Sequence, residues 1–155
     1  MLATYSKRSL SEADYKALAE FRHQIRRFLH FSEKAAHQAG LEPAQHQLLL
    51  AIKGLADDVR PRIAELAARL QIQHHSTVEL VNRLEAGGFV HRRQGKEDRR
   101  EVLLELSTRG ERVLQELSLH HKAELRSQGP ALLRSLHRVI AHDRSGSRRK
   151  RRKDA

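Results

Sequence analysis

The feature that most constrains the fold is a change of apolar spacing at Gly87-Gly88. Before this pair, apolar residues recur at three- and four-residue steps, the spacing of amphipathic helices. After it, residues 89–93 and 101–106 have the composition of short strands and flank a charged loop that contains Gly95. Two such strands around a glycine-containing loop predict a β-hairpin. A hairpin that directly follows a run of helices is typical of a winged helix-turn-helix.

The helical part of the sequence divides into four predicted helices. The first covers residues 11–40, Pro43 and Pro61 begin the second and third, and a tight break at residues 71–73 leads to the fourth. Each has an apolar stripe at helical spacing, which predicts one buried face. In the second to fourth helices the residues predicted to face inward are Leu48, Leu49, Ile52, Leu55, Ile63, Leu66, Ala67, Leu70, Thr77, Leu80, Val81 and Leu84.

Two further helices are predicted after the hairpin. Ser107 is placed to cap the fifth, and Gly129-Pro130 is expected to end it because proline lacks the amide hydrogen that a helix interior needs. The sixth helix then carries a short apolar face, formed by Leu132, Leu133, Leu136, Val139 and Ile140. Such a face needs a partner, either in the same chain or in a second copy.

These elements predict a mainly α protein with a small β-hairpin wing, divided into four segments. Residues 1–41 form an N-terminal arm and dimerisation helix, and residues 42–106 form the winged helix-turn-helix lobe. Residues 107–143 form the C-terminal dimerisation helices. Residues 144–155 form a basic tail, predicted to be disordered because its composition cannot supply a core.

The charge balance indicates an anionic partner. The 155 residues include 30 Lys and Arg against 19 Asp and Glu, a formal net charge of +11. Six cations and one acid lie in residues 145–155, so the rest of the chain is basic as well. Such a balance favours binding to nucleic acid or to an anionic membrane surface. The tail itself either adds contacts to phosphates or is a solvated terminus.

Several classes of function are excluded by composition. The chain has no cysteine, which removes disulfides, thiol nucleophiles and redox-sensing thiols and is consistent with a cytoplasmic protein. No apolar run approaches the roughly 18 residues of a membrane helix. No nucleophile-histidine-acid arrangement, glycine-rich phosphate loop or pair of carboxylates has a recognisable spacing, so we expect neither an enzyme nor a cofactor.

The fourth helix and the hairpin have the residue types that read duplex DNA. A helix of this kind fits the major groove, and a basic hairpin beside it can contact phosphates and the minor groove. Any amphipathic helix has a polar outer face, so the five cations within residues 92–100 carry most of the argument. Asp98 is expected to pair with the Arg100 guanidinium and fix its orientation. The candidate DNA-binding residues are His74, His75, Ser76, Glu79, Asn82, Arg83, Arg93, Lys96, Asp98, Arg99 and Arg100.

Three motifs in order resemble the MarR family of transcriptional regulators. Residues 66–70 (Leu-Ala-Ala-Arg-Leu) and 76–90 are similar to that family's helix-turn-helix. Residues 98–100 (Asp-Arg-Arg) resemble its Asp-x-Arg wing signature, and residues 106–110 (Leu-Ser-Thr-Arg-Gly) resemble the Leu-Thr-x-x-Gly that follows the wing. The similarity covers about residues 42–117.

The resemblance implies a homodimer in which terminal helices interlock and two winged lobes bind double-stranded DNA at a palindromic operator. It also implies a regulator, of the repressor type, that is released by a small ligand bound between the dimerisation helices and the lobe. Phenolic or aromatic acids are a common ligand class in this family, but no residue of this chain identifies the ligand.

The 11 histidines leave one question open. His23, His30 and His37 follow one face of the first helix at seven-residue steps, and His120 and His121 lie on the fifth. Imidazoles from two helices can bind zinc or copper or act as a pH switch. No pair of ligands sharpens such a site, so we expect surface or interface histidines and no metal. The alternative function is a winged-helix module that is not a regulator, such as a metal-responsive or protein-interaction domain.

Overall fold

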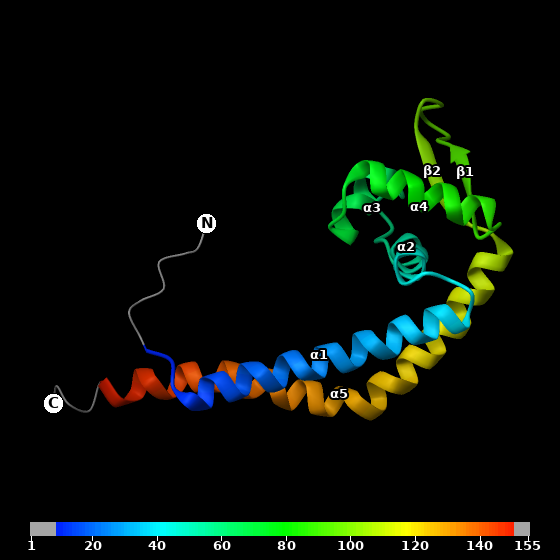
Figure 1. Cartoon of the computed structure of the whole chain (residues 1–155). Helices are drawn as coiled ribbons and strands as arrows, with labels where there is room; N and C mark the ends of the chain where they lie inside the picture. The colour runs from blue at the N-terminus through cyan, green and yellow to red at the C-terminus, as the bar shows by residue number, and fades with distance from the viewer. Residues whose placement is uncertain (1–8, 151–155) are drawn as a thin grey trace. The chain divides into compact units, whose positions relative to one another are not determined.

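The computed structural model describes residues 9–150, with only the backbone given for residues 142–150. Within this range the chain is mainly helical, with one antiparallel hairpin, as the apolar spacing predicts (Figure 1). The elements in chain order are α1 (Glu12–Gln38), α2 (Pro43–Lys53), α3 (Ile63–Leu70), α4 (His74–Ala86), β1 (Val90–Gln94), β2 (Val102–Leu106) and α5 (Thr108–Lys150).

The chain divides into two compact units. One comprises Met1–Phe31 and Lys122–Ala155, of which residues 9–31 and 122–150 are described, and the other comprises Ser32–His121. The end of α1 and the first turns of α5 therefore belong to the same unit as the helix-turn-helix and the hairpin. The limits of the two units therefore lie at residues 31 and 122, whereas the sequence pattern suggests segment boundaries at residues 41 and 107. The difference arises because both long helices run from one unit into the other.

The core of the unit Ser32–His121 is built from the predicted helix stripes. Thr77, Leu80, Val81 and Leu84 of α4 are all buried, and the three apolar ones pack in one cluster with Leu48 of α2 and with residues of α3, β1, β2 and α5. Burial of this face holds α4 by one side only. Its opposite side is therefore left on the surface of the lobe.

The turn between α3 and α4 is tight, as predicted. Gln71 has a left-handed backbone with φ 54°, and the Ile72 amide donates to the Ala67 carbonyl at 3.1 Å, which ends α3 within one residue. The predicted start of α3 at Pro61 is wrong by two residues. Helix α3 begins at Ile63 because Arg62 has an extended backbone and the Pro61 carbonyl accepts a hydrogen bond from the Leu104 amide of β2 at 3.0 Å.

The hairpin pairs Val90 with Leu106 and Gln94 with Val102, one residue from the predicted strand limits. Ser107 caps the following helix as expected, since its Oγ accepts the Gly110 amide at 3.0 Å. The hairpin lies beside α4 and extends from the lobe (Figure 1).

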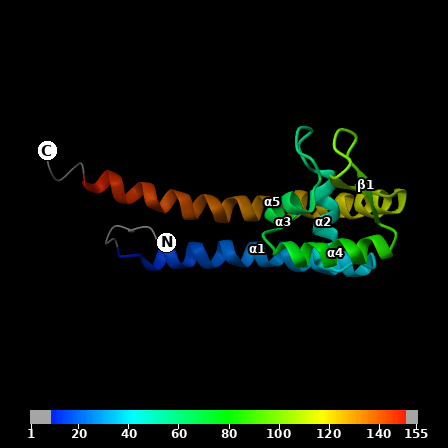
Figure 2. The same ribbon diagram turned by 90° about the horizontal axis from the view of Figure 1, so that it is seen from above.

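In the other unit, α1 and α5 run side by side and antiparallel, which both views show (Figures 1 and 2). The Arg27 Nη2 donates to Gln128 Oε1 at 3.0 Å between them. Several apolar side chains of this pair remain exposed, with Leu133 at 68%.

The predicted break at Gly129-Pro130 is wrong, because α5 is one helix with Pro130 inside it. Proline removes one hydrogen bond, but packing holds the helix on both sides of it: Gln128 bonds α1, and Ser135 is buried. The backbone of α5 continues to Lys150 and so includes residues 144–150, which composition assigns to a disordered tail. Residues 151–155 of that tail, and residues 1–8 of the N-terminal arm, lie outside the described residues. No helix within residues 9–150 combines the length and apolarity that crossing a membrane requires.

Candidate nucleic-acid interface

Helix α4 presents its polar residues on the side opposite the core. His74 and His75 in its first turn, and Glu79, Asn82 and Arg83 farther along, are exposed, and Ser76 is half-buried. The structure therefore brings the residues predicted to read DNA onto the free surface of one helix. The first turn carries no acidic residue, which leaves the positive end of the helix dipole unopposed there.

The segment after the wing holds the end of α4 in place. Ser107 Oγ donates to the Gly88 carbonyl at 2.6 Å, and Arg109 Nη1 donates to the Gly87 carbonyl at 2.8 Å. The Arg109 guanidinium also lies 4.4 Å from the centre of the Phe89 ring. These contacts explain why the Leu-Ser-Thr-Arg-Gly segment follows the wing: it fixes where α4 ends and the hairpin begins.

The arginines within β1 are paired inside the protein. Arg92 forms an ion pair with Glu85 of α4, and its Nη2 donates to Asn82 Oδ1 at 2.7 Å. Arg93 forms an ion pair with Glu105 on β2. On sequence grounds the five cations of the hairpin are treated alike. In the structure, Arg92 joins the hairpin to α4 and Arg93 joins β1 to β2.

The cations at the tip of the wing are exposed, and of the three only Arg100 has an acidic partner within the described residues. Lys96 and Arg99 are exposed and form no ion pair with any residue that the structure describes. The Arg100 side chain is 96% exposed, and its Nε lies 3.6 Å from Asp98 Oδ1. The expected pairing of Asp98 with Arg100 is present, but the shorter contact is to the backbone, where the Arg100 amide donates to Asp98 Oδ1 at 2.9 Å.

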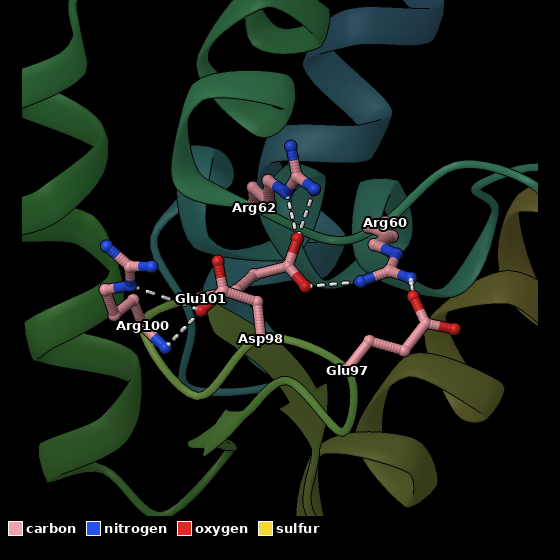
Figure 3. A network of polar contacts seen from close by, with 6 residues as sticks. All are labelled: Arg60, Arg62, Glu97, Asp98, Arg100 and Glu101. Atoms are coloured by element: carbon pink, nitrogen blue, oxygen red, sulfur yellow. Dashed lines mark hydrogen bonds and ion pairs between the residues drawn. The ribbon is translucent and has the colours of Figure 1, made fainter.

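Sequence reasoning missed a carboxylate that anchors the wing. Glu101 binds Arg60 and Arg62, which lie about 40 residues earlier, and Arg60 also binds Glu97 (Figure 3). The hydrogen bonds from Arg60, and then those from Arg62, hold the pKa of Glu101 below its ordinary value, while these carboxylates raise the pKa of Arg60. No local pattern marks these residues, because only the fold brings them together.

The histidine stripe does not gather into a ligand set in the described part of the chain. No group of three histidine or carboxylate side chains there is arranged to hold a metal ion. His37 instead lies 3.4 Å from Glu42, within ion-pair distance.

Helices α2 to α4, the hairpin and the exposed face of α4 beside the wing define a winged helix-turn-helix protein. Comparison with family models places residues 39–101 in the MarR family. The matched segment comprises α2, α3, α4, β1 and the loop after β1, so the similarity to MarR family regulators lies in the winged helix-turn-helix lobe.

Solved structures share this fold at low sequence identity. AbsC, a MarR family transcriptional regulator from Streptomyces coelicolor, aligns with TM-score 0.69 and 21% identity over 92% of this chain and 99% of its own. CouR from Rhodococcus jostii, solved with p-coumaroyl-CoA, aligns with TM-score 0.63 and 23% identity over 74% and 80%. Bordetella bronchiseptica BpsR, whose DNA binding is regulated by 6-hydroxynicotinic acid, aligns with TM-score 0.54 and 20% identity over 69% and 79%. A search of curated protein sequences finds no match.

Proposed function

We propose that the protein is a cytoplasmic repressor that binds a palindromic operator as a homodimer and is released by a small aromatic or phenolic acid. The observation that carries this proposal is the arrangement of one lobe, in which the exposed face of α4 lies beside a wing whose tip cations, Lys96, Arg99 and Arg100, are exposed. A helix of this kind supplies base contacts, and exposed cations supply phosphate contacts.

The two elements have different tasks in this proposal. His75, Ser76 and Arg83 are the side chains of α4 best placed to reach base edges, and Lys96, Arg99 and Arg100 bind phosphates or enter the minor groove. Internal pairing gives Arg93 and Asn82 a second role in holding the hairpin against its neighbours. His74, Glu79 and Asp98 complete the proposed contact surface.

A homodimer accounts for the apolar side chains that remain exposed on α5. Leu133, Leu136 and Ile140 lie at three- and four-residue steps on its C-terminal part and are exposed in the single chain. A second copy would cover them. Because two identical lobes related by a twofold axis contact DNA in opposite directions, the operator is expected to be an inverted repeat.

The experiment that tests this proposal is selection of bound duplexes from a random library by the full-length protein. The expected result is an inverted repeat whose half-sites are centred about one helical turn apart. Enrichment of a single unrepeated half-site contradicts the homodimer on a palindrome, and absence of any enriched sequence contradicts specific binding.

A cavity between α2 and α5 is our candidate for the effector site. It has a volume of about 350 Å³, an apolar side formed by Leu50 and Leu114, and an ion pair between Lys53 Nζ and Glu111 Oε1 at 2.6 Å. The carboxylate of an aromatic acid can replace Glu111 as the partner of Lys53 while its ring contacts the leucines. The aromatic acid that regulates BpsR has this chemistry, which supports the choice of ligand class.

This site predicts that Lys53→Gln weakens the response to aromatic carboxylates. Benzoate, salicylate and 6-hydroxynicotinate would be titrated into the protein-operator complex, with release followed by fluorescence anisotropy. The variant is expected to need about tenfold more of an effective acid, since a hydrogen bond to a charged group contributes about 1.5–3 kcal/mol. Lys34→Gln, at an exposed lysine of α1, is the charge-matched control. An unchanged response of Lys53→Gln contradicts this site.

A further inference from the structure

Glu101 forms ion pairs with two arginines, although no motif in the sequence marks it. Arg60 Nη1 donates to its Oε2 at 2.5 Å, and Arg62 binds its Oε1 through both Nε and Nη2 (Figure 3). Its side chain is only 8% exposed, whereas that of Glu97, which contacts Arg60 alone, is 79% exposed. One nearly buried carboxylate therefore holds two guanidinium groups from another part of the chain, one on each of its oxygens.

The backbone of Glu101 closes the wing loop. Its carbonyl accepts the Gly95 amide at 2.8 Å, and its amide donates to the Asp98 carbonyl at 3.1 Å. Residues 95–100, which carry the exposed cations, are thus a closed loop whose base is Glu101. Since the side chain of the same residue binds Arg60 and Arg62, the loop is attached at its base to the segment that leads into α3.

The network borders the space between the wing and the start of α4. A groove of about 580 Å³ is lined by Arg62, by Arg100 and Glu101 of the wing, and by His74 of α4. A shift of the loop at Glu101 therefore changes the separation between the reading helix and the wing cations. Both elements must meet the same duplex at once, so this separation matters for binding.

We propose that Glu101 is a positioning residue for DNA binding: together with Arg60 and Arg62 it fixes the wing loop so that Lys96, Arg99 and Arg100 reach the backbone while α4 occupies the groove. This inference rests on the proposed role of α4 and the wing in DNA binding. Arg60 and Arg62 act here through Glu101 rather than as phosphate contacts.

Whether Glu101→Gln raises or lowers the affinity for DNA distinguishes a positioning role of Glu101 from a purely electrostatic one. A carboxylate near DNA repels phosphates, so Glu101→Gln would tighten binding if Glu101 contributed only its charge. A positioning role predicts the opposite, because the neutral amide cannot hold two guanidinium groups and the loop loses its anchor. Glu97→Gln removes the same charge from the same network but leaves Glu101 in place, and it is the matched control.

The experiment is fluorescence anisotropy with full-length protein and the selected operator at several salt concentrations. Glu101→Gln is expected to bind about 5- to 30-fold more weakly than the unmodified protein, the range of one strong interaction. Glu97→Gln is expected to bind as tightly or more tightly. Binding by Glu101→Gln that equals or exceeds that of the unmodified protein overturns the proposal.

A double-mutant cycle tests whether Glu101 acts through the wing. In a variant with Lys96→Ala, Arg99→Ala and Arg100→Ala, Glu101→Gln is expected to cause no further loss, because the contacts that it positions are already absent. An undiminished loss in that background overturns the proposal. If the triple variant itself binds like the unmodified protein, the proposed role of the wing fails first, which distinguishes the two failures.

Folding of the variants has a separate readout. The bond from the Leu104 amide to the Pro61 carbonyl and the two backbone bonds of Glu101 do not depend on its side chain, so Glu101→Gln should keep its fold by circular dichroism. Hydrogen exchange at the amides of residues 95–100 should accelerate in this variant and not in Glu97→Gln. Should Glu101→Gln unfold, Arg62→Lys carries the test at unchanged charge, with a 5- to 30-fold loss supporting the proposal and no loss contradicting it.

Discussion

The role of an arginine in this lobe depends on the carboxylate beside it more than on its place in the sequence. Arg92 and Arg93 lie in the wing but are paired with Glu85 and Glu105, whereas Arg100 is almost fully exposed. A paired guanidinium must give up or share its partner before it binds a phosphate, which reduces the net gain. Exposed and paired cations should therefore differ in how strongly their loss affects DNA binding.

His46 is the residue for which the structure predicts a dependence of stability on pH. It is 3% exposed, and its ring centre lies 4.8 Å from that of His121, whose Nε2 in turn lies 2.8 Å from Ser32 Oγ. Burial, and then the charge of His121, lower the pKa of His46 below its ordinary value of 6.5. Below that value the unfolded chain binds a proton that the folded chain excludes, so the free energy of unfolding falls as the pH falls.

Thermal unfolding between pH 7.5 and 5.5 tests this prediction. The unmodified protein should lose stability over this interval, and His46→Gln should lose less, because glutamine does not titrate. His23→Gln, at an exposed histidine of α1, should behave like the unmodified protein. An identical loss in His46→Gln would show that His46 is not the group responsible.

At the scale of elements, the join between the hairpin and α5 depends on a glycine. A Cβ at Gly110 would lie 2.0 Å from the Phe89 carbonyl oxygen, whereas a Cβ at Gly129, farther along α5, meets no atom within 4 Å. Gly110→Ala should destabilise the protein by about 1–3 kcal/mol, because backbone has to move. Gly129→Ala should stabilise it by about 0.5–1 kcal/mol. Chemical denaturation measures both, and equal effects of the two substitutions would be incompatible with this packing.

The sequence alone is sufficient to predict the elements that depend on the spacing and type of neighbouring residues. The period of the apolar residues predicts α2, α4 and the hairpin within one or two residues, and the residue types on α4 and the wing predict the candidate surface. The predicted helix break at Gly129-Pro130 is wrong because packing against α1 outweighs the tendency of proline to end a helix. The Glu101 contacts with Arg60 and Arg62 were not predictable, since they depend on a fold that joins segments about 40 residues apart.

At the scale of the whole molecule, the proposed homodimer requires the exposed apolar face of α5. Leu133→Glu places a charge on the most exposed residue of that face and should shift the protein from dimer toward monomer at micromolar concentration. Ile72→Glu, at an exposed apolar residue in the turn between α3 and α4, should remain a dimer. Light scattering with multi-angle detection distinguishes the two. A dimeric Leu133→Glu would place the interface elsewhere.

The central claim is that the wing binds phosphates while α4 reads bases, and one set of binding curves tests it. Affinity for operator and scrambled duplexes would be measured by fluorescence anisotropy across a salt series for Arg100→Ala and Arg83→Ala. Arg100→Ala should weaken binding to both duplexes and lower the slope of log K against log salt by about one unit. Arg83→Ala should cost roughly 1–3 kcal/mol on the operator and much less on the scrambled duplex. If Arg100→Ala binds both duplexes as the unmodified protein does, the wing is not a DNA contact and the account is wrong.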